Sequence, residues 1–260
     1  FGGTVPNPPA FGVGFPVDMV FHKIITSNNG PWEWSSRLTA GKVLGSHTDS
    51  SESTDSQFRF DYQTGAHDSG SSYSNHYAWM FKRAPGFFDV VAYTGTGIAG
   101  GFAHNLAATP EFMIIKRRDQ AESWVVYTTA IDGSMDYTYL NGQNPKGDSS
   151  SGLPTSTVFN LSAGTQVNAS GGNYVAYLFA TLPGISKIGS YTGNGANGAQ
   201  QVDCGFTNGA AFILVKNASS SGDWYLLDSE RGINAYNETE PYLTLNTKNS
   251  EQTANMLGYH

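Results

Sequence analysis

Apolar residues along this chain occur in short runs rather than at the spacing of a helix. The runs are rich in Val, Ile, Phe, Tyr and Trp, and most are bounded by Gly, Pro, Asn, Asp or Ser, which is the pattern of β-strands joined by turns. They cover residues 19–25, 77–81, 87–93, 112–115, 124–127, 137–140, 174–180, 211–215, 224–227 and 242–245. We therefore predict an all-β protein built from antiparallel strands.

Two stretches of the chain have closely related sequences. Residues 76–95 read HYAWMFKRAPGFFDVVAYTG and residues 174–193 read YVAYLFATLPGISKIGSYTG, aligned without a gap at an offset of 98. Both contain the same Pro-Gly turn and both end in Tyr-Thr-Gly, which begins at Tyr93 and at Tyr191. A matched turn before a matched strand is the mark of an internal repeat.

A second pair of matching segments follows the first. The run that begins at Phe112 ends in Lys116 and leads to Trp124, and the run that begins at Phe212 leads at the same spacing to Trp224. A weaker third copy opens the chain, where the run at 18–23 is followed by Trp32 and Trp34. Since recurrence inside a chain mostly reflects core packing, we expect a repeated core from the following residues: Trp124, Trp224, Phe112, Phe212, Tyr93 and Tyr191.

These repeats predict tandem antiparallel β-sandwich units, jelly-roll or lectin-like, with a period of about 98 residues. The first unit would span residues 1–86 with its N-terminal strand missing or atypical, the second 87–184, and the third, incomplete, 185–260. A chain that starts and stops in mid-unit is expected of a piece of a longer modular protein. Rigid units packed side by side suit an elongated assembly.

Composition narrows the classes of partner. The net charge is −7, and the charged residues make up only 13% of the chain, without the clusters of Lys and Arg that a phosphate-binding surface needs. No apolar run is long enough to cross a bilayer as a helix. We predict no nucleic-acid partner and no membrane insertion, and the single cysteine excludes an internal disulfide.

Catalytic motifs are scarce. The histidines show no metal-ligand spacing, and neither a nucleophile elbow nor a phosphate-binding lysine loop occurs. The best pair of carboxylates is Asp228 and Glu230, whose spacing on a strand is near that of a glycosidase. We prefer a structural interpretation in which Asp228 and Arg231 hold a tight turn before Gly232. An enzyme is therefore not expected.

Two polar segments bring oxygen ligands close together, at residues 49–55 and 132–136. Neither matches the twelve-residue calcium loop, so we interpret them as solvated loops and expect no metal or cofactor. Carbohydrate binding has more support, because exposed aromatic rings can stack on sugars. Trp32, Trp34 and Tyr236 are the first candidates for contact with a glycan, followed by Tyr137, Tyr139 and Tyr242.

The repeated text resembles a known family over residues 15–246. The matching segments are Tyr-Thr-Gly-Thr-Gly at 93–97, Thr-Pro-Glu-Phe-Met-Ile-Ile-Lys-Arg at 109–117, Trp124, Tyr-Val-Ala-Tyr-Leu-Phe at 174–179, Asp-Ser-Glu-Arg-Gly at 228–232 and Leu-Thr-Leu-Asn at 243–246. They are similar to repeated β-rich domains of unassigned function in virion proteins of tailed phages, especially phages of marine bacteria and cyanobacteria. The second copy departs from this pattern, since Asp-x-x-Arg-Gly is replaced around residues 130–133.

The resemblance implies a non-enzymatic structural component of a phage virion, a tail-fibre or appendage module that contacts host surface glycans. The implied location is the virion. The implied partners are further copies of the chain, with a trimer as the usual arrangement of fibres, other virion proteins and host surface polysaccharide. The alternatives are a capsid-decorating virion protein and a carbohydrate-binding module of a secreted bacterial protein. A glycoside hydrolase is the third class of function considered.

Overall fold

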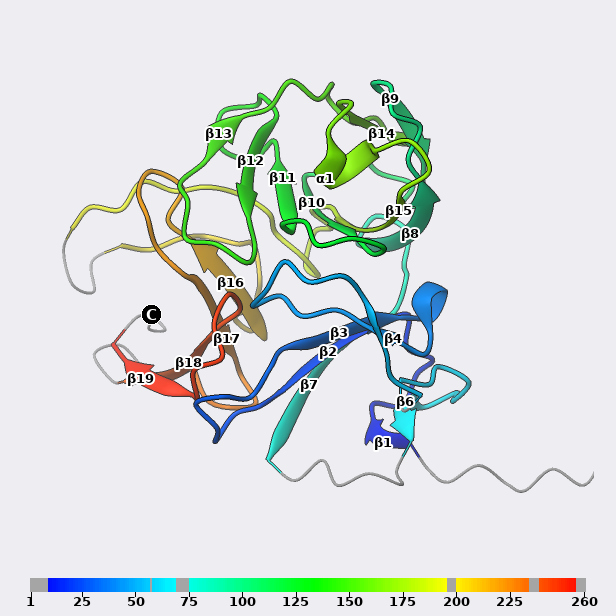
Figure 1. Ribbon diagram of the computed structural model, residues 1–260. Helices are drawn as coiled ribbons and strands as arrows, with labels where there is room; N and C mark the ends of the chain where they lie inside the picture. Colours follow the sequence, from blue (N-terminus) through cyan, green and yellow to red (C-terminus); the bar gives the residue numbers. More distant parts are fainter. Residues whose placement is uncertain (1–8, 57, 69–74, 196–199, 234–238, 256–260) are drawn as a thin grey trace, which may run out of the picture.

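The computed structural model describes residues 9–56, 58–68, 75–195, 200–233 and 239–255. Within them the protein is nearly all β, with several antiparallel sheets, which confirms the predicted class (Figure 1). The helical elements there are a 3-10 turn, η1 (Arg37–Thr39), and one short helix, α1 (Thr165–Asn168). No helix in these residues has the length and apolar character to span a bilayer.

The first segment of the chain forms a three-stranded sheet in the order β3-β2-β7. Its strands are β2 (Met19–Ile24), β3 (Glu33–Ser36) and β7 (His76–Phe81). Two small sheets accompany it. Their strands are β1 (Pro9–Gly12) with β6 (Gly65–Asp68), and β4 (Lys42–Val43) with β5 (Ser53–Thr54).

The middle of the chain forms the largest sheet, in the order β13-β12-β11-β10-β15-β8. Its strands are β8 (Phe88–Thr94), β10 (Phe112–Arg117), β11 (Val125–Thr128), β12 (Asp136–Tyr139), β13 (Gly147–Asp148) and β15 (Asn173–Phe179). A second layer here is the pair of β9 (Gly100–Ala103) and β14 (Val158–Leu161).

The end of the chain forms a sheet in the order β16-β17-β18-β19. Its strands are β16 (Phe212–Lys216), β17 (Trp224–Asp228), β18 (Glu240–Thr244) and β19 (Gln252–Ala254). The sheets of the described residues each stay within one of the segments 1–86, 87–184 and 185–260, which we call the first, second and third segments. All the apolar runs read from the sequence overlap strands.

The central hairpins of the three segments share one register. Opposite residues are Phe21 and Trp34 in β2–β3, Ile114 and Val126 in β10–β11, and Leu214 and Leu226 in β16–β17. In each hairpin this pair belongs to, or packs against, a single buried cluster. Because side chains alternate along a strand, this common register turns the same face of each hairpin toward the shared core.

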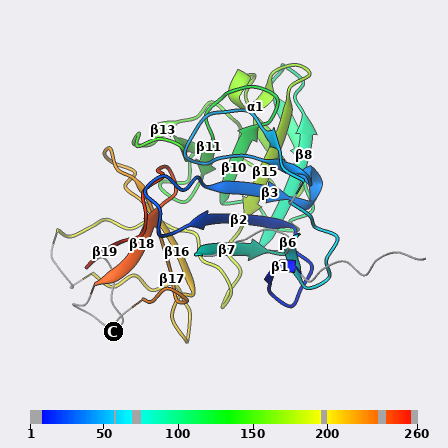
Figure 2. The same ribbon diagram turned by 60° about the horizontal axis from the view of Figure 1, so that its bottom comes forward.

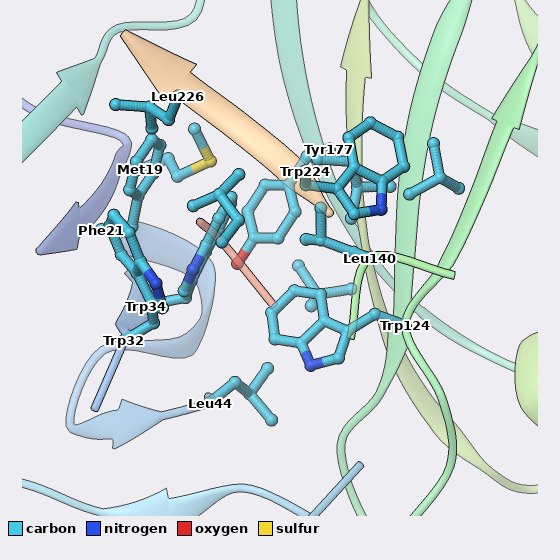
Figure 3. Close-up of a cluster of buried hydrophobic side chains, with 14 of the residues drawn as sticks. Met19, Phe21, Trp32, Trp34, Leu44, Trp124, Leu140, Tyr177, Trp224 and Leu226 are labelled. Atoms are coloured by element: carbon cyan, nitrogen blue, oxygen red, sulfur yellow. The ribbon is translucent and has the colours of Figure 1, made fainter. Parts of the chain in front are cut away.

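That core joins all three segments, as the three groups of strands around it in Figures 1 and 2 indicate. Figure 3 shows its side chains converging: Met19, Phe21, Trp32, Trp34, Leu44, Trp124, Leu140, Tyr177, Trp224 and Leu226. A second cluster lies inside the second segment and a smaller one inside the first. The segments therefore pack as one body around a common centre, rather than as separate units in a row.

Three tryptophans close this arrangement into a ring. Each indole N–H donates to a backbone carbonyl of another segment at 2.8–2.9 Å: Trp32 to Thr244, Trp124 to Gly45 and Trp224 to Tyr139. The three bonds link the first segment to the third, the second to the first, and the third to the second. We call these residues the latch tryptophans.

The surroundings of the latches also correspond. The accepting carbonyls of Gly45, Tyr139 and Thr244 each receive a second hydrogen bond from the N–H three residues later, at 3.2–3.4 Å. The backbone N–H of each latch tryptophan donates to a side chain two residues after an accepting carbonyl: Trp32 to His47, Trp124 to Asn141 and Trp224 to Asn246. The Leu-Asn pairs before β13 and after β18 therefore supply the asparagines that accept hydrogen bonds from the backbone of Trp124 and Trp224.

A lysine at or next to the end of the first strand of each hairpin makes structural hydrogen bonds. Lys116 donates to the Asp49 carbonyl at 3.1 Å, and Lys216 to the Gln143 carbonyl at 3.3 Å, so each reaches the preceding segment. Lys23 is fully buried and donates to the Gly30 carbonyl. Burial lowers the pKa of Lys23 and of Lys116 to about 8, because it disfavours the charged ammonium.

Candidate functional site

The residues expected to contact a glycan lie elsewhere than predicted. Trp32 is 0% exposed and Trp34 is 2% exposed, so neither can stack on a sugar, and the surface role expected for them is wrong. Trp32 occupies the latch position, and Trp34 packs on Phe21 with ring centroids 4.2 Å apart. Tyr236 lies outside the described residues.

The residues expected in a repeated core divide into two groups. Trp124 and Trp224 are buried, and Phe112 and Phe212 are half-buried against the shared cluster. Tyr93 stacks on Tyr174 and donates to the Val167 carbonyl at 2.7 Å.

Tyr191 is 53% exposed, and its expected place in the core is wrong. Tyr93 is covered because β8 pairs with β15, whereas the described residues around Tyr191 form no strand. The same Tyr-Thr-Gly sequence therefore gives a half-buried, packed ring at Tyr93, where a partner strand is present, and an exposed ring at Tyr191.

Asp228 and Arg231 hold the turn after β17. Arg231 donates from its backbone N–H to Asp228 at 3.0 Å and from Nε to the same carboxylate at 2.7 Å. Its guanidinium also reaches Glu251 at 3.1 Å, and Trp79 donates to Asp228 at 3.2 Å. Asp228 is buried while Glu230 is exposed, so this pair does not form two carboxylates facing one groove.

The polar segment at residues 132–136, interpreted from the sequence as a solvated loop, lies where several carboxylates gather around a lysine. Lys146 Nζ lies 3.0 Å from Asp132, 2.6 Å from Asp136 and 3.3 Å from Asp148. Hydrogen bonds to Asp136 and Asp132 raise the pKa of Lys146 above its usual value. An ammonium thus occupies the place that a cation would take, and the described residues contain no group of His, Cys, Asp and Glu arranged to hold a metal ion.

Histidines gather in the first segment, a feature that sequence spacing missed. His22 and His67 are fully buried with ring centroids 4.7 Å apart, and His76 lies 5.3 Å from His22. Burial lowers the pKa of His22 well below its usual value and that of His67 to about 3, and neighbouring histidines add to both shifts. Glu33 approaches His22 at 3.5 Å. The two buried rings are therefore neutral at neutral pH.

A groove on the second segment offers both aromatic rings and polar groups to a ligand. The face of β11–β12 that packs on the second cluster forms its floor, because Tyr127 lies opposite Tyr137 and Val125 opposite Tyr139 in the strand register. The walls are α1, with the residues just before it, and the turn after β13. The cavity measures about 450 Å³, which lies within the usual range for small-molecule sites.

The groove combines aromatic rings with polar groups. The rings of Tyr137 and Tyr139 meet edge to face with centroids 5.7 Å apart. Gln166 interacts with the Tyr139 hydroxyl, and burial raises the pKa of Tyr139 above its ordinary value. Carboxylates enter from Glu122 and Asp148, and hydroxyls from serines and a threonine at the walls. The site is therefore acidic and rich in hydrogen-bonding groups.

Comparison with known proteins gives one match. The model of a family described as a domain of unknown function, DUF7483, covers residues 81–258, about two thirds of the chain. The chain belongs to this family. Searches of curated proteins and of solved structures found no match. The DUF7483 region includes two of the latch tryptophans and all the residues that line the groove.

Proposed function

We propose that this DUF7483 protein is a non-enzymatic structural component of a phage virion, a tail-fibre or appendage module that contacts host surface glycans. The observation that carries the structural role is the ring of latch tryptophans around one shared core. Each segment contributes a donor and an acceptor, so no segment can move without breaking a buried contact. Such a closed scaffold suits a part that holds its shape outside the cell.

The matched registers and latches support a tandem duplication with a period of about 98 residues as the origin of this scaffold. A jelly-roll or lectin-like character of the individual units stays a prediction. Two charged groups also support the structural role. Arg231 and Lys146 are engaged in ion pairs within their own segments. Buried or bridging charges of this kind fix geometry.

The carbohydrate-binding module is the second candidate function, favoured by the groove on β11–β12. Aromatic rings beside carboxylate and amide groups are the chemistry that holds sugars, and the groove has both. The two proposals differ in where the chain acts. One places it on a particle, with further copies and other virion proteins as partners, and the other places it on a secreted bacterial protein.

Analysis of purified particles tests the virion proposal. Phage particles banded on a density gradient are examined by mass spectrometry, and averaged cryo-electron density is searched for the three-segment body. We expect the chain in the particle fraction at a fixed ratio to the capsid protein, with density on the tail or its appendages. Recovery of the chain solely as a free protein outside the particle fraction would refute the proposal.

A further inference from the structure

We propose that the groove between β11–β12 and α1 binds a neutral pyranose sugar, and that it discriminates against uronic acids and sulfated sugars. This inference rests on the proposed contact with surface glycans and names the site and the ligand class. It concerns the second segment alone.

The aromatic pair supplies the surface for a sugar ring. Tyr137 and Tyr139 are both half-buried, so each keeps part of its ring or hydroxyl accessible from the groove. Pyranoses present C–H groups on one face and hydroxyls around the edge, and the first pack on aromatic rings while the second need hydrogen bonds. A groove with a tyrosine floor and polar walls matches both requirements.

The position of Tyr137 is set by a missing side chain. Gly147 lies opposite Tyr137 across β12–β13, and a Cβ on Gly147 would stand 2.8 Å from the tyrosine ring. The ring can therefore lie against the backbone of β13. An alanine at this position would push the ring aside without removing it.

The charges of the groove decide which sugars fit. Glu122 and Asp148 contribute two carboxylates. No Lys or Arg among the described residues lines the groove, and two cations close to it are already paired: Lys146 with three aspartates, Asp148 among them, and Arg117 with Asp119. A carboxylate or sulfate on the ligand would therefore find two carboxylates and no cation in the lining, whereas neutral hydroxyls can donate to both carboxylates.

The third segment provides an internal comparison. Tyr225 and Tyr242 also meet nearly edge to face there, with centroids 5.5 Å apart, and Tyr242 follows the register of Tyr137. The walls contributed by α1 and the turn after β13 have no counterpart among the described residues of that segment. Tyr242 is therefore the matched control for Tyr137.

Saturation-transfer difference NMR on the full chain tests the proposal, with methyl glucoside, methyl galactoside, methyl mannoside and the methyl glycoside of N-acetylglucosamine as probes. Methyl glucuronide is the anionic match of methyl glucoside. We expect transfer to at least one neutral probe at about 10 mM or below, and binding of the uronide about tenfold weaker. Glu122→Gln should narrow that tenfold difference.

Variants decide whether the groove is responsible. Tyr137→Ala should abolish transfer and Gly147→Ala should weaken it severalfold, whereas Tyr242→Ala should leave it unchanged. Circular dichroism and urea unfolding of each variant show whether the fold is kept. The proposal is overturned if no neutral probe binds, if the uronide binds as well as the glucoside, or if Tyr242→Ala has the same effect as Tyr137→Ala.

These outcomes are separate from those of the virion proposal. A chain that is found in particles but binds no probe retains the structural role and loses the glycan site. A chain that binds a neutral sugar through Tyr137 but is absent from particles retains the site and loses the virion role.

Discussion

Replacing a latch tryptophan with phenylalanine should destabilise the whole protein rather than one segment. In Trp224→Phe the indole N–H bond to the Tyr139 carbonyl at 2.9 Å is lost. That carbonyl keeps a second donor, the N–H of Gly142 at 3.2 Å, so the change does not leave it unsatisfied. The net loss for the hydrogen bond is therefore about 1 kcal/mol.

Packing adds to this loss. Trp224 is 4% exposed and belongs to the shared cluster, and a phenylalanine ring leaves part of its volume empty. Complete truncation of a buried aromatic residue costs about 3–5 kcal/mol, so the smaller change should cost about 1–2 kcal/mol. We expect Trp224→Phe to lower the free energy of unfolding by about 2–3 kcal/mol, and Trp32→Phe and Trp124→Phe to do the same.

Trp34→Phe is the matched control. Trp34 is 2% exposed in the same cluster, but its buried indole N–H has no hydrogen-bond partner among the described residues. Its replacement loses packing and removes an unsatisfied donor, and these effects oppose each other. We expect a change of about 1 kcal/mol or less, so that the difference between Trp34→Phe and the latch variants reports a hydrogen-bonded against an unpaired indole N–H.

Urea unfolding followed by far-ultraviolet circular dichroism measures these changes without depending on tryptophan fluorescence. One cooperative transition with an unchanged slope is expected for every variant, because all three segments share one core. The reasoning is refuted if the latch variants and Trp34→Phe lose the same stability. It is also refuted if a latch variant unfolds in two separate steps.

Three further predictions follow from the same structure. Tyr93→Ala should lower the free energy of unfolding by about 3–5 kcal/mol, while Tyr191→Ala should change it by less than about 0.5 kcal/mol. Urea titration measures both values, and equal effects would contradict the exposed position of Tyr191. Below pH 6.5 His22 and His67 take up protons in the unfolded chain but stay neutral in the folded protein, because their folded pKa values are lowered. The free energy of unfolding should therefore fall with decreasing pH by about 1.4 kcal/mol per pH unit for each ring. Thermal unfolding at pH 7 and pH 5 measures this change, and equal stability at the two pH values would exclude it. Arg231→Leu leaves two carboxylates without their cation and should lower the free energy of unfolding by about 3–5 kcal/mol. Guanidinium unfolding measures this loss, and a loss under about 1 kcal/mol would show that the turn forms without Arg231.

The strand content could be predicted because it depends on the local amino-acid sequence. Runs of β-branched and aromatic residues between turn residues became strands, and the Phe-to-Lys segments became the first strands of the hairpins. The short strands of the second layer, β9 and β14, were missed because each has only four residues, and β9 is also Gly-rich, so neither carries a clear periodicity. The turn role of Asp228 and Arg231 was also readable, because it involves neighbours in sequence.

The places of the aromatic residues were harder to predict. Trp32 follows Lys23 one residue later than Trp124 follows Lys116, so the first copy does not align with the others without a gap. The register of β2–β3 nevertheless puts Trp32 in the latch position. The accepting carbonyls share no residue type, because a backbone group can be supplied by any amino acid. The three hydrogen bonds of the latch tryptophans could therefore not be predicted from the sequence.

The groove arises from what the second segment adds to the common scaffold. All three segments have a hairpin in the same register, and the second and third carry a tyrosine at the matching position of the next strand, Tyr137 and Tyr242. In the second segment the chain between β12 and β15 runs through β13, β14 and α1, and residues of β13, α1 and the adjoining loops line the groove beside β11–β12. The latches fix one face of that hairpin against the shared core, and its other face packs on the second cluster and carries the tyrosines of the groove. The shared hairpin register thus accounts for the rigid support of the groove, and the connection through β13, β14 and α1 accounts for its walls.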